Sequence, residues 1–143
     1  MKIAPYLMFD GNCREAFTTY ETVFGGRIVA MMDHRGTPAE AHVPPEWLDK
    51  IMHACLELDG QMLMASDAPP GRSDGPMRSV SVSVNVPEVA EAERIFAALS
   101  EGATIQMPME ETFWAPRFGM LRDRFGTNWM IAAEMPADRA NCG

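Results

Sequence analysis

The sequence predicts an α+β fold made of two βαβββ modules, each with a mixed sheet whose outer face carries a helix and whose concave face encloses a cavity. Residues 79–86 alternate serine or asparagine with valine, and this period of two is typical of a strand. Apolar residues recur at helical spacing within 16–24 and again within 89–99, each time after a strand-like run. The order of strand followed by amphipathic helix therefore occurs once in each half of the chain.

A constant offset relates the two halves. Tyr20 and Phe96 are 76 residues apart, and so are Gly26 and Gly102, which we expect to end the two helices. One offset that aligns both helices and both stops indicates an internal duplication. The predicted boundaries are a single domain over 1–143, a first module at 3–67, a second module at 79–135 and a flexible tail at 136–143.

In the first module, local signals mark the start of the helix and one tight turn. Asn12 is a favourable N-cap, and Glu15, three residues later, can complete a capping box. Asp59-Gly60 is a strong signal for a two-residue hairpin between two apolar runs. The expected strands are 3–9, 27–32, 51–58 and 61–65.

In the second module, Pro87 suits the first position of the helix, and Phe125-Gly126-Thr127 is expected to form a turn. The expected strands are 79–86, 103–107, 118–122 and 129–134. Two long stretches rich in proline and glycine, 33–47 and 67–78, are expected to be irregular.

Composition excludes several classes of function. The chain has 12 basic and 20 acidic residues and a net charge of −8, which argues against binding to nucleic acid. No apolar run approaches the ~18 residues of a membrane span, and the N-terminus lacks a secretory signal, so we expect a cytoplasmic protein. The spacing of Cys13, Cys55 and Cys142 suggests neither disulfides nor a zinc site.

Alternation predicts polar groups on the sheet face that the helices leave uncovered. If the valines of 79–86 meet the helix, the intervening serines point the other way. The same reasoning separates polar from apolar residues in two more strands. The residues assigned to the uncovered faces are Ser79, Ser81, Ser83, His53, Cys55, Glu57, Met130, Ala132 and Glu134. Because burial of unpaired polar groups is costly, such a face should line a wet groove or cavity.

Several short segments together resemble a known family. They are Pro5-Tyr6-Leu7-Met8-Phe9-Asp10-Gly11-Asn12-Cys13, Ala16-Phe17 with Tyr20, Lys50-Ile51-Met52-His53-Ala54, Met64-Ala65-Ser66-Asp67, Thr112-Phe113-Trp114-Ala115, Phe118-Gly119, Asp123-Arg124-Phe125-Gly126 and Trp129-Met130-Ile131. Spread over nearly the whole chain, they resemble the PhnB-like branch of the vicinal oxygen chelate superfamily, which includes glyoxalases and bleomycin-resistance proteins. The resemblance implies paired βαβββ modules, a homodimer and a ligand site in the concave sheet.

Enzymes of this superfamily hold a divalent metal through His and Glu ligands on the first and last strands of each module. Carried over to this sequence, those positions fall at Pro5 or Tyr6, at Ser81, around 64–66 and at Met130. None is a strong ligand for such an ion, so we expect no metal at the usual centre and no cofactor. The branch also carries the label of a ubiquinone-pathway methyltransferase, but no glycine-rich turn joins a strand to a helix here.

The residues expected nearest a ligand are His53, Cys55, Asp67, Ser81, Trp114, Phe118, Met130 and Glu134. His53 is the best candidate for a general base or a hydrogen-bonding group, although a histidine satisfied by its neighbours is the structural alternative. A metal site of His53, Cys55 and Glu57 is disfavoured, because alternate residues on one strand are ~6.5–7 Å apart.

The other candidates also have structural alternatives. Asp67 can cap its turn or bind a polar ligand group. Trp114 can cover the cavity or pack in a dimer interface, and Glu134 can serve the site or be solvated. The methionines at 62, 64, 107, 109, 120 and 130 are expected to fill the core rather than to bind a soft metal.

The pattern as a whole favours a metal-free protein that binds a small molecule. One alternative is an enzyme of the same fold, of lyase, isomerase or dioxygenase type, that uses His53 with a carboxylate or a non-standard metal site. Another is a dimeric structural or interaction protein with a vestigial cavity. No residue is assigned a catalytic role from sequence.

Overall fold

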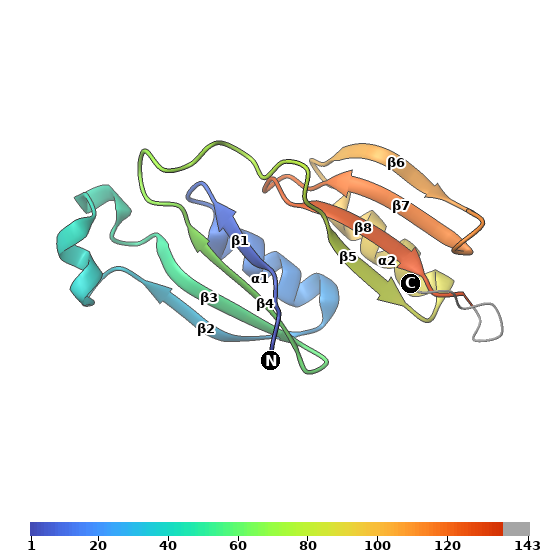
Figure 1. The fold of residues 1–143 in the computed structure, drawn as a ribbon, viewed down its shortest axis with the longest axis horizontal. Helices are drawn as coiled ribbons and strands as arrows, with labels where there is room; N and C mark the ends of the chain where they lie inside the picture. Colours follow the sequence, from blue (N-terminus) through green and yellow to red (C-terminus); the bar gives the residue numbers. More distant parts are fainter. Residues whose placement is uncertain (136–143) are drawn as a thin grey trace. The chain divides into compact units, whose positions relative to one another are not determined.

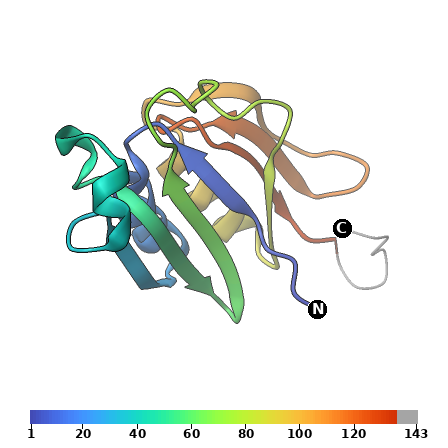
Figure 2. The same ribbon diagram turned by 60° about the vertical axis from the view of Figure 1, so that its left-hand side comes forward.

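The structure, a computed structural model, describes residues 1–135 and consists of two compact units, the first covering 1–77 and the second starting at Arg78. Each unit is a four-stranded mixed sheet with one helix on one face (Figure 1). The elements of the first unit are β1 (Tyr6–Phe9), α1 (Cys13–Phe24), β2 (Arg27–Asp33), β3 (Ile51–Leu58) and β4 (Gln61–Asp67). The strand order is β1-β4-β3-β2, and β1 runs parallel to β4 beside it (Figure 2).

The second unit repeats this plan. Its elements are β5 (Val82–Val86), α2 (Val89–Leu99), β6 (Thr104–Glu110), β7 (Arg117–Arg122) and β8 (Asn128–Ala133), in the sheet order β5-β8-β7-β6. Strand β5 runs parallel to β8 beside it, and the other two pairs of neighbouring strands are antiparallel. The predicted α+β class and the repeated βαβββ order are therefore confirmed. Neither helix within residues 1–135 is long and apolar enough to cross a membrane.

The offset between the modules is preserved with one correction. The helices start at Cys13 and Val89, which are 76 residues apart, as the sequence suggested. The glycines with left-handed backbone after the helices are Gly25 (φ 70°) and Gly102 (φ 69°), so Gly26 is not the equivalent of Gly102. Gly26 has a different role, because a side chain there would collide with the neighbouring strand β3.

Several boundaries differ from those expected. The first strand begins only at Tyr6, where its pairing with Met64 starts. Pro87 precedes α2 by two positions instead of opening it. Strand β6 continues through Pro108 to Glu110, which is tolerated because β6 lies at the edge of its sheet and its register shifts there.

The connections also differ in detail. The stretch after β2 contains two short 3-10 helices, η1 (Pro38–His42) and η2 (Pro45–Trp47). The predicted hairpin turn between β3 and β4 is confirmed, since Asp59 and Gly60 both have positive φ angles of 50° and 80°. The expected tail at 136–143 lies outside the described residues.

Each module has its own core between helix and sheet. In the first, Phe9 of β1 meets Phe17 of α1 edge to face, with ring centroids 6.2 Å apart. In the second, the largest buried side chain is Trp129 of β8. The indole Nε1 of Trp129 donates to the Asp123 carboxylate at 2.8 Å, which also accepts from the backbone of the β7–β8 turn. In both sheets, therefore, alternate residues of the strands face the helix, as the sequence predicts.

Candidate functional site

The face of the first sheet opposite α1 carries an unusual concentration of methionine. The registers place Arg27, Ala30 and Glu57 on this face, and with them a set of eight further side chains: Tyr6, Met8, Met32, His53, Cys55, Met62, Met64 and Ser66. We call this set the methionine face. Four of its large side chains are substantially exposed: Tyr6 (45%), Met8 (43%), Met32 (45%) and Met62 (40%). The expectation that Met62 fills the core is therefore wrong for this residue, because alternation turns it away from α1.

His53 is held by a partner that the sequence did not suggest. The Tyr6 hydroxyl and His53 Nδ1 are 3.2 Å apart, and the two rings stack with centroids 5.9 Å apart and planes inclined by 26°. Within residues 1–135, His53 Nε2 makes no hydrogen bond to the protein. The pair therefore presents an unused polar atom on a largely apolar surface. The sequence indicates Tyr6 only as a position of the superfamily metal. The parallel pairing of β1 with β4 brings it near β3.

The other polar groups of the methionine face donate to sulfur. The Cys55 thiol lies 3.5 Å from Met62 Sδ, and the Ser66 hydroxyl lies 3.5 Å from Met8 Sδ. Glu57, the carboxylate on the same strand, is bound to Arg27 at 3.2 Å. His53 therefore has a phenol as its neighbour, and the nearby carboxylate is engaged elsewhere.

Asp67 lies on the opposite, helical side of the sheet and is 3% exposed. Its Oδ1 accepts hydrogen bonds from the backbone N–H groups of Gly11 and Cys13, both at 3.0 Å, and its Oδ2 accepts from that of Ile51 at 2.7 Å. The side chain of Asn12 makes no capping bond, so the predicted cap of α1 is replaced by Asp67. The Asp67 carboxylate is thus fully used in joining β1, α1 and β3.

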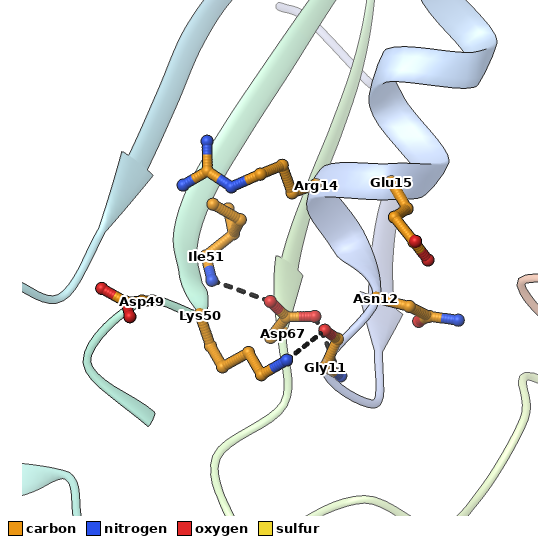
Figure 3. Close-up of a pocket in the computed structure, with 8 residues that line it drawn as sticks. All are labelled: Gly11, Asn12, Arg14, Glu15, Asp49, Lys50, Ile51 and Asp67. Atoms are coloured by element: carbon orange, nitrogen blue, oxygen red, sulfur yellow. Dashed lines mark hydrogen bonds between the residues drawn. The ribbon is translucent and has the colours of Figure 1, made fainter. Parts of the chain in front are cut away.

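A pocket of about 360 Å³ lies beside this carboxylate, at the N-terminal end of α1 (Figure 3). Its lining residues are Gly11, Asn12, Arg14, Glu15, Asp49, Lys50, Ile51 and Asp67. Lys50 Nζ donates to the Gly11 carbonyl at 2.8 Å, and Asp49 is paired with Arg35. Of the eight predicted ligand-binding residues, Asp67 alone borders this pocket. The polar groups that line this pocket mainly stabilise the turn between β1 and α1.

Three of the predicted ligand-binding residues, Trp114, Phe118 and Met130, lie together on the face of the second sheet opposite α2. Trp114 is 46% exposed and meets Phe118 edge to face at 5.3 Å. Phe118 belongs to a buried cluster with Ala115 and Ala132, against which Met107, Met120 and Met130 pack. Ser81 and Glu134 are exposed just outside the ends of β5 and β8. The second sheet therefore also carries methionines on its uncovered face, and they are only partly buried.

Cys13, the first residue of α1, is fully buried beside Asp67. Burial raises the pKa of its thiol from 9.0 to about 12, and the Asp67 carboxylate adds to the shift, against a smaller opposing effect of Arg14. The folded protein therefore keeps this proton at pH values where the unfolded chain loses it. The stability that the protonated Cys13 thiol adds to the folded protein is fully present below about pH 9 and is lost as the pH rises toward 12.

We expect the stability of the wild type to fall between pH 9 and 11 by about 1.4 kcal/mol per pH unit relative to Cys13→Ala. Urea unfolding at a series of pH values measures this difference, and the variant serves as its own correction for other groups that titrate. Parallel pH profiles for the two proteins would show that the Cys13 thiol has an ordinary pKa.

The positions of the superfamily metal do not fit a divalent ion. Tyr6 is engaged with His53, and Met64 and Met130 offer only thioethers. Among residues 1–135, no group of three or more His, Cys, Asp or Glu side chains is placed to hold a metal ion.

Comparisons with known proteins agree with this architecture. Residues 1–132 match the family described as 3-demethylubiquinone-9 3-methyltransferase. The crystal structure of protein PA1353 from Pseudomonas aeruginosa is 47% identical, with a TM-score of 0.87, over 95% of this chain and 99% of that one. Protein YjdN of Escherichia coli K12 is 31% identical over 92% of this chain and 94% of its own length.

A third relative is a PhnB protein from Bacillus cereus, named as a putative 3-demethylubiquinone-9 3-methyltransferase. It is 25% identical, with a TM-score of 0.79, and the match covers 93% of this chain and 99% of that one. The fosfomycin resistance protein FosX from Listeria monocytogenes, whose structure contains Mn(II) and a dihydroxypropylphosphonic acid, is 8% identical with a TM-score of 0.65 and shares the fold alone.

Proposed function

We propose that this chain, which belongs to the PhnB-like family described as 3-demethylubiquinone-9 3-methyltransferase, binds a small organic molecule on the methionine face without a divalent metal. The fold is that of glyoxalase/bleomycin resistance/dioxygenase proteins. The observation that supports the proposal most is the Tyr6–His53 pair. This pair has polar atoms, one of them unused within residues 1–135, on the same sheet face as the exposed thioethers of Met8, Met32 and Met62. Apolar walls with a few placed polar groups are typical of ligand sites.

The fold itself is compatible with small ligands, since FosX holds a small phosphonic acid together with Mn(II). In this chain the donor set differs, because the positions of the superfamily metal ligands hold thioethers, at Met64 and Met130, and the Tyr6 phenol, which is bonded to His53. Binding by apolar contact and a single hydrogen-bonding pair is therefore the function that these residues support. We assign no methyl transfer, because residues 1–135 contain no glycine-rich turn between a strand and a helix.

Methyl-labelled methionine provides a direct test. We expect compounds that bind from a library of small acids, phosphonates, thiols, ketones and quinone-like molecules to shift the methyl resonances of Met8, Met62 and Met64, assigned by single Met→Leu substitutions. Met31, which the register places toward α1 beside Ala54, serves as the internal control. If no compound of the library shifts a methyl resonance of the methionine face, the proposal is refuted.

The contribution of the pair is tested by His53→Leu and Tyr6→Phe. Either change removes the hydrogen bond between the rings, and we expect a loss of about tenfold in affinity for a bound compound. Binding is measured by titration of the methyl shifts, and the unfolding midpoint of each variant confirms that the fold is intact. Unchanged affinity in both variants would separate the pair from ligand binding.

We also propose that the protein is a homodimer. Phe113 (90% exposed) and Trp114 (46% exposed), on the loop before β7, offer apolar surface for a second copy. Light scattering of the purified protein should give twice the mass of one chain.

A further inference from the structure

We infer that the ligand of the methionine face is a neutral, planar aromatic molecule that carries a hydrogen-bond acceptor oxygen, of the aryl ketone type. This inference rests on the proposed function and specifies its ligand class. Three properties of the face lead to it: the chemistry of its apolar groups, the hydrogen left over by the Tyr6–His53 pair, and its lack of an unpaired positive charge.

The apolar groups of the face are thioethers and aromatic rings. Met8, Met32, Met62 and Met64 come from three different strands, so their sulfur atoms are distributed across the sheet. Thioether sulfur is polarizable and makes favourable contacts with aromatic rings, and unbranched methionine chains adapt to a flat molecule. A sheet face built from branched aliphatic residues would offer no such preference for aromatic over saturated rings.

The Tyr6–His53 pair leaves one hydrogen for a ligand in either arrangement of its protons. If the Tyr6 hydroxyl donates to His53 Nδ1, the neutral imidazole carries its proton on Nε2, which has no partner in residues 1–135. If Nδ1 donates to the Tyr6 oxygen instead, the hydroxyl hydrogen is the one left over. The pair therefore always offers a donor, and an acceptor oxygen on the ligand satisfies it.

Charge favours a neutral molecule over an anion. The chain has a net charge of −8, and Arg27, the arginine that the registers place on this sheet face, lies opposite Glu57. The Arg27 guanidinium is already paired with the Glu57 carboxylate, at 3.2 Å. A carboxylate ligand would lose its hydration without gaining a cation, which disfavours its binding.

Four probes of similar size separate these requirements: acetophenone, cyclohexyl methyl ketone, ethylbenzene and ethylcyclohexane. Each is titrated against the full-length protein with methyl-labelled methionine. We expect acetophenone to bind at least about fivefold more tightly than either singly altered probe, since each loses one favourable interaction. Its ring should also produce ring-current shifts at Met62 and Met64. The combined variant Met62→Leu, Met64→Leu should reduce the preference for acetophenone over cyclohexyl methyl ketone, and Met31→Leu should leave it unchanged.

Equal binding of the saturated ketone would overturn the aromatic requirement, and equal binding of ethylbenzene would overturn the acceptor requirement. In both cases binding at the methionine face, and with it the proposed function, would stand. If none of the four probes shifts these resonances while other library compounds do, the ligand class is wrong. Silence of both the probes and the library would refute the proposed function itself.

Discussion

Replacing Asp67 by alanine is expected to lower the free energy of unfolding by about 4 kcal/mol, because each buried donor left unsatisfied costs about 1–3 kcal/mol. The Asp67 carboxylate accepts from three backbone N–H groups, those of Gly11, Cys13 and Ile51, and is 3% exposed. Alanine leaves all three without an acceptor and opens space between α1 and the sheet. Urea unfolding of purified wild type and variant measures the difference.

Two controls make this prediction specific. Asp67→Asn keeps an acceptor oxygen for Gly11 and Cys13 but presents an amide N–H₂ to the Ile51 N–H, so we expect roughly half of the alanine effect. Asp10→Ala changes an exposed aspartate in the same turn and should stay within about 0.5 kcal/mol of wild type. A loss below about 1 kcal/mol for Asp67→Ala would mean that water replaces the carboxylate.

The second large effect is expected for Gly26→Ala. A Cβ atom at this position would lie 2.5 Å from the backbone oxygen of Glu57 and even closer to the side chain of Leu58. The Leu58 side chain can rotate, but the backbone oxygen belongs to the β2–β3 ladder, which starts where Arg27 pairs with Glu57. We expect a loss of about 3 kcal/mol, at the upper end of the cost of overpacking.

The neighbouring glycine supplies the comparison. At Gly25 an added Cβ meets no atom within 4 Å, but φ is 70°, so Gly25→Ala should cost only about 1–2 kcal/mol through backbone strain. Thermal and urea unfolding of both variants rank the two effects. A smaller loss at Gly26 than at Gly25 would show that β2 and β3 can move apart without penalty.

The sequence was sufficient where a signal is local. The serine–valine alternation located β5, Asp59-Gly60 located the hairpin turn, and the helical spacing of apolar residues located both helices. These features depend on neighbouring residues, whose preferences a single sequence displays directly. The fold class follows from them, because a strand–helix unit repeated twice allows few arrangements.

The sequence was insufficient where contacts join distant segments. Asn12 is the better local cap for α1, yet the parallel pairing of β1 with β4 brings Asp67, 54 residues beyond Cys13, to the same backbone groups. Tyr6 and His53 are separated by 47 residues and meet across β4 in the same way. Nothing in the local pattern distinguishes such a partner from other polar residues on the same face.

The methionine residues show a second limit of prediction from the sequence. Patterning treats it as a core residue, but strands whose two faces are both apolar give no indication of which face the helix covers. Only the position of α1 shows that Met62 points away from the core. The candidate residues His53 and Cys55 were placed on the correct face because their neighbours Ala54 and Leu56 are unambiguous core residues.

The irregular strands β2 and β6 also limit how this protein can associate. Each forms one border of its sheet, and each changes register twice along its length; Pro108 removes an N–H group from β6 as well. An incoming chain would find no unbroken row of donors and acceptors along either border. Strand addition at β2 and β6 is thereby discouraged, whereas β1 and β5, which form the other border of each sheet, keep an unbroken register with their neighbours.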